Sequence, residues 1–117
     1  MSNVINIGNG TGMEFLGDYS FSFDANARAL TSQVMMDDAD SYKMLIFTVA
    51  GYSVVPQITK VSDKLRQVKF NGLDTTLFGD VSIIPTQNAS GFNGKFNVCR
   101  TVYSAAAVLN VQVWGIK

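Results

Sequence analysis

The sequence predicts an all-β protein, a single antiparallel β-sandwich or jelly-roll-like domain of about eight short strands with an N-terminal arm. The last ten residues give the clearest evidence, because Leu109, Val111 and Val113 alternate with other residues as in a half-buried strand. Strand-like segments also recur at roughly 8–12-residue intervals, separated by residues that favour turns. Finally, the Asn-Gly dipeptides at 71–72 and 93–94 favour tight connections between strands.

The length and composition fit one domain with a partly covered surface. A chain of 117 residues can bury a core without the help of metals or disulfides. Charged residues make up only 15% of the sequence, whereas they are about a quarter of a typical globular domain. We therefore expect an outside rich in uncharged side chains, part of which is covered by partners.

Several classes of function are disfavoured. Nine basic and nine acidic residues cancel, so we expect no binding to nucleic acid through bulk charge. Cys99 is the only cysteine and there is no histidine, so an intrachain disulfide cannot form and a cysteine nucleophile would lack its usual base. We expect Cys99 to be a buried structural thiol, and the protein to have no enzyme activity and no cofactor.

The chain has no pattern of a targeting or membrane segment. Its start lacks the basic residues and long apolar core of a signal peptide. Its apolar runs fall well short of the ~20 residues needed to cross a bilayer. We expect synthesis in the host cytoplasm without a signal peptide, and no membrane partner.

Residues 1–13 are predicted to form the arm, and residues 14–117 the sandwich domain. Asn and Gly in this arm alternate with residues that are too apolar for a solvated tail. These are Val4, Ile5, Ile7 and Met13. Two interpretations are open: an arm that lies on a neighbouring subunit or partner, which we favour, or an ordinary first strand of the same domain.

The predicted strands follow in order from residue 19. Residues 19–23 place three aromatic side chains on one face and two serines on the other, the pattern of a strand. Residues 29–36 fit a strand or a short helix. Residues 42–50 form a nearly continuous apolar run, which is typical of a central strand covered on both faces.

Two interpretations are open for residues 56–70. Apolar residues at helical spacing, with Pro56 in a first turn, fit a helix. The β-branched residues and the turn-forming residues 62–64 instead favour a hairpin, which is the interpretation we prefer.

The remaining segments are predicted from turn signals. Residues 71–72 predict a tight two-residue hairpin, because both central residues of such a turn need a positive φ. Residues 80–84 form a strand that Pro85 would end. The turn signal returns at residues 93–94, and residues 97–103 predict the strand before the terminal one.

No cluster of residues singles out a catalytic or metal site. Asp37, Asp38 and Asp40 would suit Ca²⁺ but lack the glycine and glutamate of an EF-hand loop, so we expect a solvated turn. Trp114 lies on the polar face of the terminal strand, where it would be an interface anchor, a sugar-stacking platform or a cover for the far side of the sandwich. A basic cluster is expected to be a charged outer hairpin face: Lys60, Lys64, Arg66 and Lys69.

Taken together, these features resemble the capsid decoration (cement) proteins and other small virion structural proteins of tailed bacteriophages. The resemblance rests on the Asn/Gly-rich residues 3–12, the aromatic strand 19–23, the two Asn-Gly dipeptides and the terminal strand 108–116. It implies a β-rich, non-enzymatic and oligomeric protein of the virion that clamps neighbouring capsid subunits. The implied partners are further copies of the chain, with a trimer as one option, and a major capsid or other virion protein.

Five residues are the predicted contacts of this function: Val4, Ile5, Ile7, Met13 and Trp114. The alternative function is a receptor- or glycan-binding tip domain of a phage fibre, in the form of a trimeric jelly roll. That alternative predicts a threefold interface and an exposed aromatic pocket that uses Trp114, Tyr103 or Tyr52.

Overall fold

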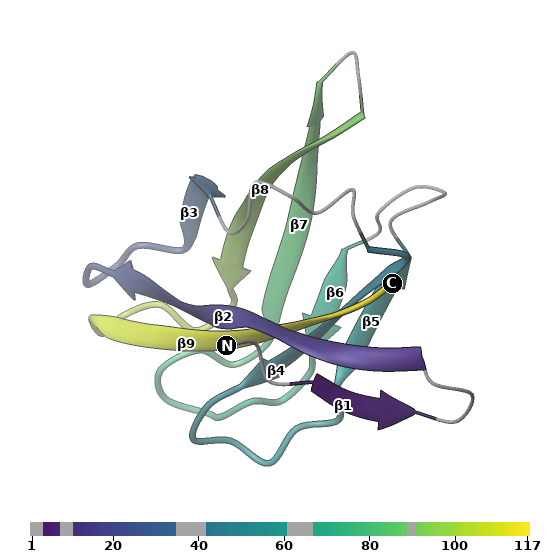
Figure 1. Ribbon diagram of the computed structural model, residues 1–117. Helices are drawn as coiled ribbons and strands as arrows, with labels where there is room; N and C mark the ends of the chain where they lie inside the picture. The colour runs from purple at the N-terminus through teal and green to yellow at the C-terminus, as the bar shows by residue number, and fades with distance from the viewer. Residues whose placement is uncertain (1–3, 8–10, 35–41, 61–66, 89–90) are drawn as a thin grey trace.

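The computed structural model describes the chain except for residues 1–3, 8–10, 35–41, 61–66 and 89–90, and it confirms the predicted all-β class (Figure 1). The described residues contain no helix, and hence none long and apolar enough to cross a membrane. The strands, in chain order, are β1 (Val4–Ile7), β2 (Thr11–Phe23), β3 (Ala29–Val34), β4 (Met44–Val49), β5 (Gln57–Lys60), β6 (Val68–Phe70), β7 (Val81–Asn88), β8 (Gly91–Arg100) and β9 (Ala107–Ile116).

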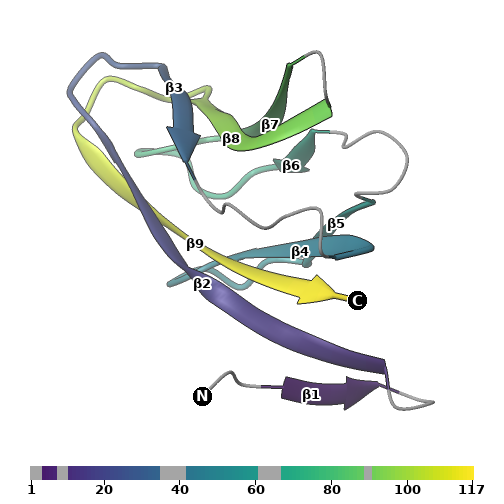
Figure 2. The same cartoon turned by 45° about the horizontal axis from the view of Figure 1, so that its top comes forward.

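The strands form two antiparallel sheets that lie face to face as a sandwich. One sheet has five strands in the order β1-β2-β9-β4-β5, and the other has four in the order β3-β8-β7-β6. Figure 2 shows the two layers from the side. The terminal strand β9 lies between β2 and β4 in the middle of the larger sheet, so the residues that gave the clearest strand signal also form its centre.

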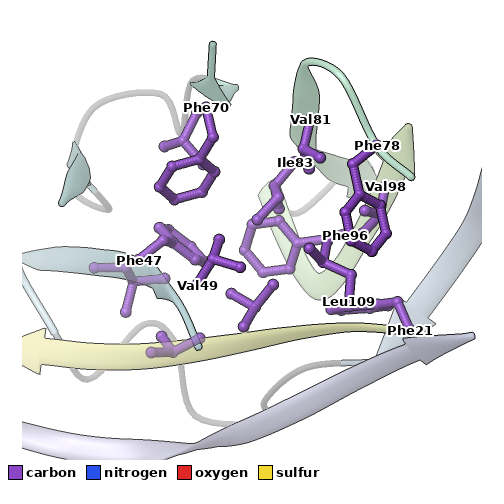
Figure 3. Packing of buried hydrophobic residues seen from close by; sticks show 14 of the residues in the cluster. Phe21, Phe47, Val49, Phe70, Phe78, Val81, Ile83, Phe96, Val98 and Leu109 are labelled. Carbon is purple, nitrogen blue, oxygen red and sulfur yellow. The ribbon is translucent and has the colours of Figure 1, made fainter. Parts of the chain in front are cut away.

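The core fills the space between the sheets (Figure 3). Alternate residues of each strand point inward, because successive side chains of a strand lie on opposite faces. Phe47 of β4 meets Phe96 of β8 edge-to-face, with ring centroids 5.5 Å apart, and this contact joins the two sheets at their centre. The predicted inward row Leu109, Val111 and Val113 is fully buried.

The preferred hairpin for residues 56–70 is wrong in its pairing. Gln57–Lys60 and Val68–Phe70 are strands, but β5 pairs with β4 in the larger sheet and β6 pairs with β7 in the smaller one. Burial explains this outcome, since Val68 and Phe70 both point into the core from the smaller sheet. The segment is therefore a connection between the two layers.

Both Asn-Gly dipeptides take positive-φ glycines, but neither closes a two-residue hairpin. Gly72 (φ 60°) opens the loop of residues 71–80, in which the Asp80 carboxylate accepts a hydrogen bond from the Gly72 N–H. Gly94 (φ 80°) lies inside β8, opposite the register shift between Pro85 and Gln87 of β7. A left-handed glycine also fits a β-bulge, which lets the strand continue and lets β7 run through Pro85.

The region predicted as an arm contains the edge of the larger sheet. Val4–Ile7 is β1, which pairs antiparallel with the beginning of β2, and Ile5 lies opposite Met13. β2 runs without a break from Thr11 to Phe23, across the predicted boundary at residue 13. That the segment of residues 1–13 docks onto a neighbouring subunit stays a prediction.

Candidate functional site

The outer face of the five-stranded sheet carries an apolar row that crosses four strands. The register aligns Phe15 of β2 with Trp114 of β9, Trp114 with Ile46 of β4, and Ile46 with Ile58 of β5. The inward residues alternate with these, so the row faces away from the core. The rings of Phe15 and Trp114 meet edge-to-face, with centroids 4.8 Å apart.

A second apolar row lies beside the first. Met13 of β2, Ile116 of β9 and Met44 of β4 are aligned by the same register, two residues away from the first row on each strand. The two rows together form a continuous apolar area at one end of the sheet, which we call the apolar half. Its members are Met13, Phe15, Met44, Ile46, Ile58, Trp114 and Ile116.

The other end of the same outer face is polar, and its side chains are paired with each other. The Thr48 hydroxyl lies 3.0 Å from Oε1 of Gln112, and the Ser20 hydroxyl lies 2.6 Å from Oδ1 of Asn110. These cross-strand pairs leave the polar end with few unmet hydrogen bonds. One face of one sheet is thus divided into a self-bonded polar half and an apolar half.

Exposure within the apolar half is largest at the edge strand. Ile58 on β5 is 58% exposed, Ile46 is 9% exposed, and Met13, Phe15, Met44, Trp114 and Ile116 are half-buried. Single exposed apolar residues are ordinary, but an exposed isoleucine beside five half-buried apolar side chains in adjacent rows of one face makes a patch, which is the usual mark of an interaction surface.

The structure brings two of the five predicted contact residues together. Met13 and Trp114 lie in adjacent rows of the apolar half. Val4, Ile5 and Ile7 lie on β1, next to the strand that carries Met13. Phe15, Ile46 and Ile58 were not predicted, because only the register between strands aligns them with Trp114.

A second region of interest is the end of the sandwich where β2, β4, β6 and β8 finish, and it is held by polar contacts and not by apolar ones. We call the four connections there the loop end: residues 24–28, 50–56, 71–80 and 101–106. In this region polar groups are buried and hydrogen-bonded within the chain, and two residues organise most of those bonds.

Asp74 is the first of these two residues. One carboxylate oxygen accepts hydrogen bonds from the backbone N–H groups of residues 76–79, at 2.8–3.3 Å. The other accepts one from the Tyr52 hydroxyl at 2.7 Å, which ties the loop after β4 to the loop after β6. A short acidic side chain that satisfies successive N–H groups holds a loop in one shape.

These bonds shift the pKa of both partners. Burial by itself raises the pKa of Asp74, but the hydrogen bonds from Tyr52 and from the N–H groups of Phe78, Gly79 and Leu77 outweigh it and lower that pKa to about 2. The hydrogen bond to Asp74, then burial and the negative charge of Asp74, raise the pKa of Tyr52 to about 12. Near neutral pH the Tyr52 side chain is therefore a neutral phenol and the Asp74 side chain an ionised carboxylate.

Arg100 is the second organising residue, and it is 1% exposed. Its guanidinium donates to four backbone carbonyl oxygens at 2.8–3.2 Å, those of Asp24, Ala27, Leu77 and Tyr103. It also lies over the Phe23 ring, 4.6 Å from the centroid, and burial lowers its pKa. Arg100 thus joins three of the four connections of the loop end.

A pocket of about 360 Å³ opens beside the Tyr52–Asp74 bond. One wall comes from the connection after β4 and the start of β5, and the other comes from the end of β6 and the loop that follows it. Its lining residues are Tyr52, Ser53, Val54, Val55, Gln57, Lys69, Phe70, Asn71, Gly72 and Leu73. Of the aromatic residues named for the alternative function, Tyr52 lines this pocket, whereas Trp114 lies on the outer face.

Sequence reasoning passed over Arg100 and Asp74. Arg100 continues the inward row of Phe96 and Val98, so the two-residue alternation was a signal that it enters the core. Asp74 follows a turn signal and precedes a run of polar residues, which is compatible with a capped loop but with many other structures as well.

Of the other candidates from the sequence, Lys69 of the basic cluster lines the pocket. Asp37, Asp38 and Asp40 lie outside the described residues, as do Lys64 and Arg66 of the basic cluster. Within the described part of the chain there is no group of three or more residues that could hold a metal ion. Cys99 is a free thiol that is half-buried, so the expectation of full burial is wrong, because β8 turns it away from the core between inward Val98 and Arg100.

This chain was compared with protein families, curated proteins and solved structures. No protein-family model, no curated protein and no solved structure matches this chain. The function is therefore argued from the residues and the geometry alone.

Proposed function

We propose that this chain is a non-enzymatic structural protein that attaches to other protein subunits through the apolar half, in the way that a capsid decoration protein attaches to a virion. The observation that carries the proposal is the aligned row Phe15–Trp114–Ile46–Ile58 on an outer sheet face. Such a row contributes little to the core, yet it presents apolar area to any partner that covers it.

The composition of the apolar half supports a protein as its partner. It contains two aromatic residues and two methionines, and the register places the first charged residue at its border, where Lys60 of β5 lies opposite Met44. Aromatic residues and methionine are enriched at the centres of protein interfaces, and charged residues are depleted there. The adjoining polar half, with Ser20, Asn110 and Gln112, would form the polar rim that such interfaces have.

The partner we assign is the major structural protein of the same particle, with further copies of this chain beside it. A broad sheet face suits a repeated, near-flat subunit surface better than it suits a small molecule, which needs a concave site. Area buried at many equivalent subunit junctions stabilises the assembled particle by mass action. The edge strand β1, next to Met13, extends the same side of the sheet.

The test is cosedimentation of the purified protein with particles assembled from the major virion protein encoded in the same genome. Ile58→Asp places a charge at the most exposed position of the proposed contact, and we expect a roughly hundredfold or greater loss of affinity, since burying an unpaired carboxylate costs several kcal/mol. The matched control is Val108→Asp. Val108 is also a β-branched residue of similar exposure, 55%, but it lies at the polar end of the same outer face.

Binding that Ile58→Asp abolishes and Val108→Asp preserves would support the proposal. Absence of binding by the unchanged protein, or equal loss in both variants, would overturn the role of the apolar half. A gene neighbourhood without virion proteins would contradict the virion assignment itself.

The alternative function is a receptor- or glycan-binding tip domain. One observation favours it, namely that Tyr52 lines a pocket whose two walls come from different sheets. A protein of this kind would be a trimer by light scattering and would not cosediment with assembled particles, whereas a decoration protein would cosediment with them.

A further inference from the structure

The pocket beside Tyr52 is held open by bonds between its two walls. Tyr52 comes from the connection after β4, and its hydroxyl donates to Asp74 in the loop after β6. The Tyr52 ring also meets the Phe78 ring edge-to-face, with centroids 6.2 Å apart. Because Asp74 is itself fixed by four backbone N–H groups, the ring that lines the pocket has a single orientation before any ligand arrives.

Three polar side chains of the pocket wall make no hydrogen bond to another described residue, namely those of Ser53, Asn71 and Lys69. Gln57 uses its amide nitrogen to donate to the Val55 carbonyl oxygen at 3.2 Å, which fixes the amide at the pocket wall. Residues that carry hydroxyl, amide and ammonium groups therefore line one space of about 360 Å³, within the usual range for small-ligand sites.

We infer that this pocket is a binding site for one saccharide unit, in which the Tyr52 ring supports the sugar ring and the side chains of Ser53, Gln57 and Asn71 bond its hydroxyl groups. A sugar presents donors and acceptors on its rim and C–H groups on its faces. An aromatic ring with neighbouring hydroxyl and amide side chains meets both demands.

The charges and the lining disfavour other classes of ligand. Among the lining residues that the structure describes, Lys69 is the one cation, and the Asp74 carboxylate accepts a hydrogen bond from Tyr52 beside it, so a phosphate or other strongly anionic group would gain little net attraction. The polar lining of Ser53, Gln57 and Asn71 would be left unpaired by a purely apolar ligand. A neutral polyhydroxylated ring satisfies both constraints.

The experiment is saturation-transfer NMR, followed by amide spectra of the ¹⁵N-labelled protein, with a panel of monosaccharides at millimolar concentration, namely glucose, galactose, mannose, N-acetylglucosamine and N-acetylgalactosamine, each also as its methyl glycoside. We expect at least one member to bind and to shift the backbone amide signals of Ser53 and residues 69–73. Binding of the methyl glycoside assigns the site to the end of a glycan chain, and binding of the free sugar alone assigns it to a soluble sugar.

Variants distinguish the pocket from the rest of the surface. Gln57→Ala and Ser53→Ala should each weaken binding, by about tenfold if one good hydrogen bond is lost. Gln67→Ala is the matched control, since Gln67 is exposed and lies outside the lining. Tyr52→Phe keeps the ring and removes only its bond to Asp74, so it should retain binding of the sugar.

Failure of every sugar in the panel to bind would overturn this inference, as would binding that Gln57→Ala and Ser53→Ala leave unchanged. The outcome is independent of the proposed attachment function. Ile58→Asp alters the apolar half and should leave sugar binding intact, whereas the pocket variants should leave cosedimentation with particles intact.

Discussion

The loop end and the apolar half differ in where their side chains find partners. At the loop end, Asp74 accepts five hydrogen bonds and Arg100 donates four, all within the chain. In the apolar half, Ile58 and its neighbours expose hydrophobic area to the outside. The first arrangement holds the fold in place, and the second leaves favourable contact area for another molecule to bury.

This difference separates stability from function in the same small domain. A change at the loop end should lower the free energy of unfolding, because it leaves buried polar groups without partners. A change at Ile58, the exposed member of the apolar half, should hardly affect unfolding, because that side chain is already largely in contact with water. The predictions below test this separation in order of the size of the expected effect.

The largest effect is expected for Arg100→Met. Methionine fills part of the space but leaves four carbonyl oxygens without the guanidinium that joins them, and it removes a buried, hydrogen-bonded cation, so the free energy of unfolding should fall by about 3–5 kcal/mol. Urea denaturation followed by tryptophan fluorescence measures it. Arg28→Met is the control, since Arg28 is exposed, and it should change stability by no more than about 0.5 kcal/mol. Similar losses in both variants would contradict the role given to Arg100.

A pair of glycines in the loop after β6 separates backbone strain from steric clash. Gly72 and Gly79 have nearly equal φ values of 60° and 63°. A Cβ at residue 72 would meet nothing within 4 Å, whereas at residue 79 it would lie 2.5 Å from Oγ1 of Thr101.

Gly72→Ala should therefore cost about 1 kcal/mol, from the left-handed backbone alone, and Gly79→Ala about 2–4 kcal/mol. Thermal unfolding of the two variants side by side measures the difference. Equal costs would mean that the loop moves away from Thr101 freely, and the loop end would then be less rigid than its hydrogen bonds indicate.

The Tyr52–Asp74 bond gives a prediction about pH. The pKa of Asp74 is lowered from 3.8 to about 2 in the fold, so its ionised form stabilises the protein fully above the ordinary pKa. That stabilisation is lost as the pH falls through about 4 towards 2. On the alkaline side, the raised pKa of Tyr52 contributes stability that is lost as the pH rises from 10 to about 12.

Asp74→Asn should lower the free energy of unfolding by about 1–2 kcal/mol at pH 7, because the bonds to the backbone N–H groups lose their charge. The gap between the two proteins should close as the pH falls towards 2. Urea titrations at a series of pH values measure this, with the exposed Asp18→Asn as the control. A gap that is constant with pH would contradict the assignment to the carboxylate.

The sequence alone predicts those strands in which buried and exposed residues alternate regularly. Residues 19–23 and 107–116 became strands with the expected faces inward, because β-branched and aromatic residues at every second position bury one face of a sheet. In the two Asn-Gly dipeptides, the glycines have the expected positive φ but the asparagines do not. The predicted hairpin turns are absent there, since a loop capped by Asp74 and a bulge inside β8 can both use a single left-handed glycine.

The candidate site was predicted in part for a related reason. Trp114 and Met13 stood out within their own segments, because each is a large apolar residue in a polar or glycine-rich setting. Phe15, Ile46 and Ile58 belong with them only through the register of four strands, which no single segment contains. Cross-strand alignment is a property of the folded sheet, so a row of this kind becomes visible only when the strand order is known.

The smallest effect on stability is expected for Ile58→Thr, and it tests the other side of the comparison. Threonine keeps the β-branched shape that suits a strand, and Ile58 is 58% exposed, so the free energy of unfolding should change by no more than about 0.5 kcal/mol. The matched control is Val108→Thr, at the polar end of the same face.

Urea denaturation measures stability, and cosedimentation with particles measures attachment. Attachment should weaken in Ile58→Thr and not in Val108→Thr, since only the first removes apolar area from the proposed contact. A large loss of stability in Ile58→Thr would instead mean that the apolar half supports the fold of this chain, and the separation between the two regions would fail.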